Sequence, residues 1–140
     1  MLTDALEMGI RRTYICKEFW DILDSSIGAG PFDGACLVCA QALKDAAGEG
    51  DIVRIVDTST NTTHHYGLRI GGTVYDFDGA CDSRTWIQRF ARNENLTSRP
   101  LSVETGIDES AGIADDDNVR REVARLLSSR MEAVSYRLAS

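Results

Sequence analysis

The chain has no long hydrophobic run. No apolar stretch approaches the ~20 residues that a helix needs to cross a bilayer. The opening segment, MLTDALEMGIRRTY, lacks the basic start, apolar middle and small-residue cleavage site of a signal peptide. These two absences argue against membrane insertion and against secretion, and we therefore expect a cytoplasmic protein with no membrane partner.

Positive charge is also scarce. The chain has 15 Lys and Arg against 22 Asp and Glu, which gives a formal net charge of −7. No cluster of basic residues with interleaved aromatic residues is present, and such clusters are typical of proteins that bind nucleic-acid phosphates. We therefore expect no nucleic-acid partner.

The chain has only four cysteines. They are Cys16, Cys36, Cys39 and Cys81. Because nothing indicates secretion, free thiols are expected rather than disulfides. The C-x-x-C spacing of Cys36 and Cys39 lies in an apolar helical segment, without the spacers and context of a redox pair or the turn of a zinc knuckle. We expect no metal and no cofactor, with a zinc site built from cysteines and histidine kept as an alternative.

What is present predicts helices at both ends of the chain. Apolar residues recur at three- and four-residue steps from Leu6 to Leu23, with Thr3 as a possible cap, and again in a helix over 117–138 whose apolar stripe runs from Val119 to Leu138. Between them, after a glycine-rich loop at 28–34, the segment GACLVCAQALKDAAGEG is apolar nearly all round. This predicts a buried helix that ends at Gly48.

The middle of the chain predicts antiparallel strands. Residues 52–57 and 65–70 are rich in strand-forming side chains, and Gly71-Gly72 predicts a hairpin turn into a third strand at 73–78. A loop at 78–83, a helix at 85–92 with Trp86 in the core, and a short strand near 101–103 follow. The chain is therefore predicted to form one α+β domain over residues 1–140, with a three- or four-stranded antiparallel sheet.

A nucleophilic thiol is predicted at Cys36. A thiol gains nucleophilicity when it is deprotonated, and both a helix N-terminus and a nearby imidazolium favour the thiolate. Cys36 begins the buried helix, where free backbone N–H groups could also stabilise an oxyanion. No glutamine or asparagine closely precedes it, so the expected oxyanion donors are these N–H groups or Ser25 and Ser26.

The base must come from the only two histidines, His64 and His65, at the start of the second strand. Because consecutive strand residues point to opposite faces, only one of them should face Cys36. An aspartate on the neighbouring strand should orient the imidazole. Asp76 is the first candidate, with Asp78 and Asp82 as alternatives.

These segments resemble the papain-like cysteine hydrolases over roughly residues 30–92. GACLVCAQAL is similar to their nucleophile helix, and HHYGLRIGGTVYDFDG is similar to the histidine–turn–aspartate hairpin of the small bacterial and phage members. The resemblance implies a papain-like core and a catalytic triad of Cys36, His65 and Asp76, with Gly71 at the turn.

That resemblance implies acyl transfer on an amide, isopeptide or thioester bond of a protein or peptide-like substrate. Two alternatives belong to other classes. One is a phage or mobile-element accessory protein that uses this scaffold to bind and inhibit a host protein without catalysis. The other is an interaction module stabilised by zinc.

Overall fold

The structure, a computed structural model, describes residues 2–28, 30–31, 34–109 and 116–139, with the side chains of the last helix described as far as Met131. Its elements in chain order are α1 (Leu2–Tyr14), α2 (Lys17–Ser26), α3 (Cys36–Ala47), β1 (Asp51–Asp57), β2 (Thr62–Ile70), β3 (Thr73–Asp76), β4 (Gly79–Cys81), α4 (Ser83–Asn93), β5 (Leu101–Thr105) and α5 (Asp117–Ala139). The predicted α+β class is confirmed.

The sheet has one or two strands more than predicted. Its strand order is β4-β3-β2-β1-β5, and all neighbouring strands pair antiparallel. The predicted loop at 78–83 contains β4, and β3 ends at Asp76 instead of residue 78. The chain turns there because the Asp76 carboxylate accepts a hydrogen bond from the backbone N–H of Asp78 (2.8 Å), and Gly79 takes a positive φ of 121°.

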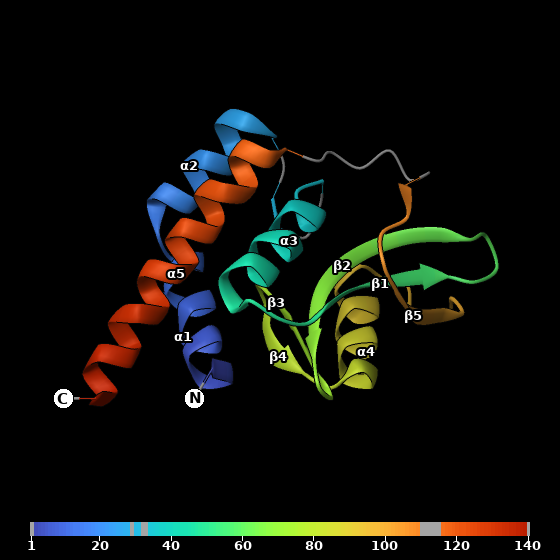
Figure 1. The fold of residues 1–140 in the computed structure, drawn as a ribbon. Coiled ribbons are helices and arrows are strands. Elements are labelled where there is room, and N and C mark those ends of the chain that lie inside the picture. Colours follow the sequence, from blue (N-terminus) through green and yellow to red (C-terminus); the bar gives the residue numbers. More distant parts are fainter. Residues whose placement is uncertain (1, 29, 32–33, 110–115, 140) are drawn as a thin grey trace.

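Helices cover both faces of the sheet. Figure 1 shows α1, α2 and α5 grouped on one side, with α3 between them and the strands. Alternating residues of β3 separate the two faces: Val74 packs with Trp86 of α4, whereas Tyr75 joins the cluster around α3. The sheet is therefore a central layer with α3 on one face and α4 on the other.

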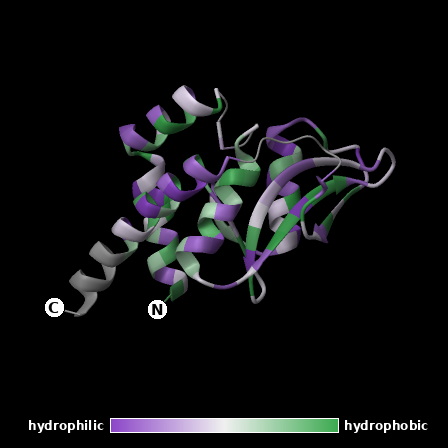
Figure 2. Cartoon of the chain, turned by 45° about the horizontal axis from the view of Figure 1, so that its top comes forward, coloured by the Kyte–Doolittle hydropathy of each residue, from purple (hydrophilic) through white to green (hydrophobic). Residues whose placement is uncertain are grey.

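The helix α3 is buried along its first two turns, as its apolar sequence predicts. All residues from Cys36 to Leu43 are buried. Figure 2 shows hydrophobic residues gathered on α3 and the strands, while hydrophilic residues predominate on the outer helices and loops. The helix ends at Gly48, whose φ of 75° lies in the left-handed region that glycine favours. Burial of α3 fixes the position of its N-terminus against β2.

The terminal helices match their predicted patterns closely. The stripe of α5 is buried at Val119, Val123, Leu126, Leu127 and Met131, whereas the side chains of Val134 and Leu138 lie outside the described residues. Thr3 is not a cap, because α1 already begins at Leu2. In the predicted loop at 28–34, residues 29, 32 and 33 also lie outside the description. Among the helices that the structure describes, none is both long and apolar enough to cross a bilayer.

Candidate active site

Cys36 is the first residue of α3, as predicted. The preceding residue, Ala35, makes no side-chain capping bond, and its carbonyl accepts from the N–H of Cys39 at 3.0 Å. The N–H groups of residues 36–38 precede this first helical bond and have no acceptor within the helix. The thiol of Cys36 therefore lies beside backbone donors at the positive end of a helix, in a residue only 2% exposed.

His65 and Asp76 meet on the α4 face of the sheet. The imidazole Nε2 of His65 lies 2.9 Å from Oδ2 of Asp76, and the two residues are 1% and 6% exposed. The ring also stacks on Phe90 of α4, with centroids 5.0 Å apart and an interplanar angle of 9°. The imidazole is thus fixed both by a carboxylate at its edge and by an aromatic ring on its face.

Cys36 influences the same imidazole. Burial alone would lower the pKa of His65, but hydrogen bonds with Asp76 and with Cys36, together with the negative charges of both, raise it from 6.5 to about 9. Because Nε2 faces Asp76, Nδ1 is the ring nitrogen that can exchange a proton with the thiol. The structure therefore brings together the three residues that the sequence singled out, with His65 in the middle.

Asp76 is held by donors that the sequence did not predict. The indole Nε1 of Trp86 donates to its Oδ2 at 2.9 Å, and Nη2 of Arg89 donates to its Oδ1 at 3.1 Å. Burial works against the carboxylate, yet the hydrogen bonds from His65 and Trp86 and the charges of His65 and Arg89 lower the pKa of Asp76 overall. The carboxylate therefore stays ionised although it is buried.

Trp86 was predicted as core packing alone. It is fully buried, but its indole N–H also donates a hydrogen bond to Asp76 in the site. Trp86 and Arg89 are three residues apart, so they share one face of α4. That spacing, in the helix that directly follows the predicted aspartate strand, is the signal that could have identified them.

The alternative aspartates have other roles. Asp78 forms an ion pair with Nε of Arg89 at 2.7 Å, and Asp82 caps α4 by accepting from the N–H of Thr85 at 2.8 Å. Of the three candidates, Asp76 is the one that the structure places against His65. Ser25, considered as an oxyanion donor, is exposed and bonds to the carbonyl of Asp21 in its own helix.

A β-bulge changes the expected side-chain orientation of the two histidines. Ile55 pairs with His65 and Val56 pairs with Thr63, which leaves His64 as an extra residue on β2. The rings of His64 and His65 both lie near Phe90, with centroid distances of 6.3 and 5.0 Å. The prediction that the two side chains point to opposite faces is therefore wrong, because it assumed a regular strand.

The remaining cysteines lie apart from this site. All four cysteines are free thiols. Burial raises the pKa of Cys39, which sits in the apolar cluster, and burial also raises that of Cys81 on β4. Cys16 is half-buried and accepts a hydrogen bond from Nη2 of Arg130 at 3.0 Å. Within the described part of the chain, no three His, Cys, Asp or Glu side chains are grouped to hold a metal ion.

A small cavity adjoins the histidine–aspartate pair from the α4 side. It has a volume of about 160 Å³, and its lining includes His65, Asp76, Asp78, Arg89 and Glu94. The polar side chains of the site therefore border an open space on the side of the imidazole–carboxylate contact.

None of the protein-family models, curated proteins or solved structures compared with the chain matches the chain.

Proposed function

We propose that the protein is a papain-like cysteine hydrolase that acts by acyl transfer on an amide, isopeptide or thioester bond of a protein or peptide-like substrate. Cys36 is the nucleophile, His65 the acid and base, and Asp76 the group that orients the imidazole. One observation carries the proposal: a buried histidine lies between the thiol at a helix N-terminus and an ionised carboxylate. The α3–sheet arrangement is consistent with a papain-like core.

The chemistry follows from this order of groups. The proton of Cys36 moves to His65, and the thiolate adds to the substrate carbonyl carbon, so that the carbonyl π electrons move to oxygen. The N–H groups at the start of α3 stabilise the oxyanion. When the tetrahedral intermediate collapses, His65 gives its proton to the leaving group, and an acyl thioester remains on Cys36.

Water completes the cycle. His65, now neutral, takes a proton from the water molecule as it attacks the thioester, and the acid product leaves with regeneration of the thiol–imidazole pair. Asp76 keeps Nε2 engaged at 2.9 Å throughout, which holds Nδ1 toward the sulfur and favours the imidazolium that forms in each step.

The test is the pH dependence of Cys36 alkylation by iodoacetamide, followed by mass spectrometry of each cysteine. Cys16 serves as a half-buried control and Cys39 as a buried control within the same chain. We expect Cys36 to react well below pH ~8.5, the pKa of a free thiol, and His65→Ala to remove this advantage. If Cys36 reacts no faster than Cys16 at pH 6, the proposal fails.

A second candidate function is a binding module on the same scaffold, which inhibits a host protein without catalysis. The observation that favours it is the burial of the thiol, since Cys36 is only 2% exposed. The two functions differ in one result. A binding module needs no reactive thiol, so Cys36→Ala would leave its partner binding intact, and the alkylation advantage would be absent.

A further inference from the structure

Tyr66 lies next to the base in the sequence but on the other face of the strand. After the bulge, successive side chains of β2 point to opposite faces of the sheet, so His65 faces α4 and Tyr66 faces α3. Tyr66 and Cys36 belong to one buried cluster with Leu37, Ala40 and Ile52. Two consecutive residues of β2 therefore approach the start of α3 from opposite sides of the strand.

The sheet leaves room for this approach. β3 pairs with β2 only from Leu68 to Ile70, so β2 has no strand partner on that side beside His65 and Tyr66. The N-terminus of α3 lies against this part of β2, because Cys36 shares a buried cluster with Tyr66 and also acts on the pKa of His65. A carbonyl group that reacts with Cys36 would therefore have the imidazole on one side and the Tyr66 ring on the other.

The hydroxyl of Tyr66 can donate a hydrogen bond. Its oxygen accepts a hydrogen bond from the backbone N–H of Asp108 at 3.0 Å, and Asp108 is itself bound through Oδ2 by the hydroxyl of Thr63 at 3.0 Å. A hydroxyl that accepts from an N–H keeps its own proton for a further bond. Among the residues that the structure describes, no acceptor for that proton is found, although Tyr66 is only 1% exposed.

The hydroxyl also remains protonated where the enzyme would work. Burial raises the pKa of Tyr66 above 10, and the negative charges of Asp108 and Cys36 act in the same direction, against the N–H of Asp108 and the charge of Arg54. A neutral phenol whose pKa is raised by the charge of Cys36 can stabilise, through its O–H, further negative charge that develops beside the sulfur.

We propose that the Tyr66 hydroxyl donates a hydrogen bond to the oxyanion that forms when Cys36 adds to a carbonyl group. It supplies a side-chain donor in addition to the backbone N–H groups of α3, in a chain that has no glutamine or asparagine shortly before the nucleophile. The inference rests on the proposed function and adds a catalytic residue to it.

Two reagents distinguish a donor to the oxyanion from a residue that acts on the thiolate or on the fold. Iodoacetamide reacts with the thiolate by displacement of iodide, so no oxyanion forms. p-Nitrophenyl acetate reacts by addition of the thiolate to the ester carbonyl, and the tetrahedral oxyanion then expels p-nitrophenolate to leave an acetyl thioester. The experiment measures both rates for Cys36 in the wild-type chain, Tyr66→Phe and Tyr75→Phe. The rate of Cys36→Ala is subtracted as background.

Tyr75→Phe is the matched control, because Tyr75 is also a buried tyrosine of the sheet but faces the cluster around α3 and α1. We expect Tyr66→Phe to lower the acetylation rate about 10²-fold, the order found for loss of one oxyanion donor. Its alkylation rate at pH 6 should equal that of the wild type, which also shows that the Cys36–His65 pair is folded. Tyr75→Phe should change neither rate.

Each other outcome overturns the inference. If Tyr66→Phe acetylates as fast as the wild type, Tyr66 is no oxyanion donor. If it loses alkylation and acetylation equally, Tyr66 acts on the thiolate or on the fold. If the wild-type Cys36 shows no advantage in alkylation, the hydrolase itself is wrong, and the role of Tyr66 fails with it.

Discussion

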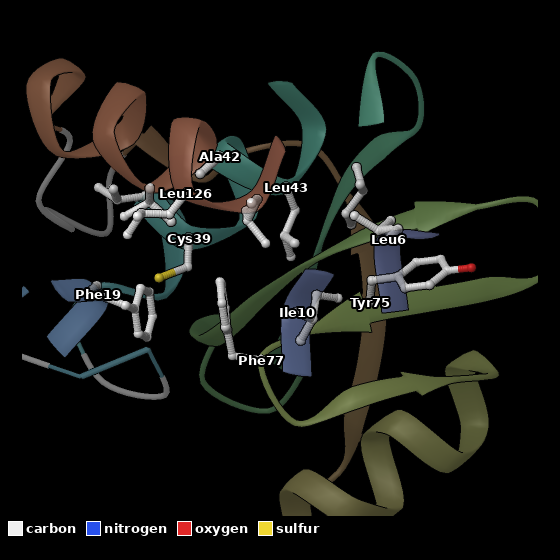
Figure 3. Packing of buried hydrophobic residues seen from close by; sticks show 14 of the residues in the cluster. Leu6, Ile10, Phe19, Cys39, Ala42, Leu43, Tyr75, Phe77 and Leu126 are labelled. Atoms are coloured by element: carbon white, nitrogen blue, oxygen red, sulfur yellow. The ribbon is translucent and has the colours of Figure 1, made fainter. Parts of the chain in front are cut away.

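Cys36 and Cys39 lie three residues apart on one helix and are both 2% exposed, yet their surroundings differ completely. Cys36 raises the pKa of His65 and lies before the first hydrogen bond of α3. Cys39 lies one turn further, in the cluster that contains Phe19 and Phe77, whose rings stack at 4.7 Å. Figure 3 shows the Cys39 side chain beside Phe19 within this cluster.

The comparison teaches that burial alone does not decide what a thiol does. Around Cys39, burial raises the pKa of the thiol far above its ordinary value, and the negative charge of Cys36 raises it further. Around Cys36, an imidazole with a raised pKa supplies a positive partner. The C-x-x-C spacing therefore describes one thiol with a chemical partner and one that serves as a small apolar side chain.

The largest effect that we expect separates the two thiols by substitution. Cys36→Ala should reduce acetylation by p-nitrophenyl acetate about 10³-fold or more, because the nucleophile is lost. Cys39→Ala should keep the rate within about twofold of the wild type, since nucleophile, base and donors remain. The measurement is the release of p-nitrophenolate. Equal losses in the two variants would show that the helix, and not the Cys36 thiol, is what matters.

A smaller effect is expected from Asp76→Asn. The neutral amide no longer favours the imidazolium, so the alkylation rate of Cys36 at pH 6 should fall about 10-fold for each pKa unit that His65 loses. Asp78→Asn is the matched control, because Asp78 pairs with Arg89 outside the His65 contact. Mass spectrometry of the alkylated cysteines gives both rates. A fall of the same size in Asp78→Asn would assign the effect to Arg89 instead.

The titration of His65 sharpens the comparison further. Its pKa, raised to about 9 by Asp76 and Cys36 against burial, should be seen in the NMR chemical shifts of the imidazole. Loss of a negative neighbour favours the neutral ring, so Cys36→Ala and Asp76→Asn should each lower this pKa. Cys39→Ala should leave it unchanged. A titration that is identical in all four proteins would show that neither Cys36 nor Asp76 sets the pKa of His65.

The smallest effect concerns stability. Cys39→Ala removes a buried sulfur from the apolar cluster, and we expect the free energy of unfolding to fall by about 1 kcal/mol. Urea denaturation measures this change, and the slope of the transition should stay constant. An unchanged midpoint would mean that the cluster closes around the missing atom without loss.

Periodicity identified the elements with the strongest patterns. The stripe of α5, the apolar surface of α3 and the Gly71-Gly72 turn were all readable, because each depends on residues close in the sequence. The strand β4 was missed, since three residues that begin with glycine carry no alternation. The bulge at His64 was also missed, because pairing between strands is not visible in one strand alone.

The site was predictable in its residue types and not in its connections. Cys36, His65 and Asp76 were named from chemistry, from local position and from the family resemblance, and their catalytic roles remain predictions. The contacts from Trp86, Arg89 and Asp108 join residues 10 to 42 positions apart. Such contacts depend on how α4 and the segment after β5 return to the sheet, which no local pattern encodes.

The bulge at His64 has a consequence for changes in chain length. On the Thr62–His64 side of His65, loss of the extra residue would make the ladder with β1 regular and leave His65 opposite Ile55. Between His65 and Gly71, loss of one residue would reverse the alternation and exchange the faces of His65 and Tyr66. Homologues that vary in length should therefore do so before His65, while the six-residue step from His65 to Gly71 stays fixed.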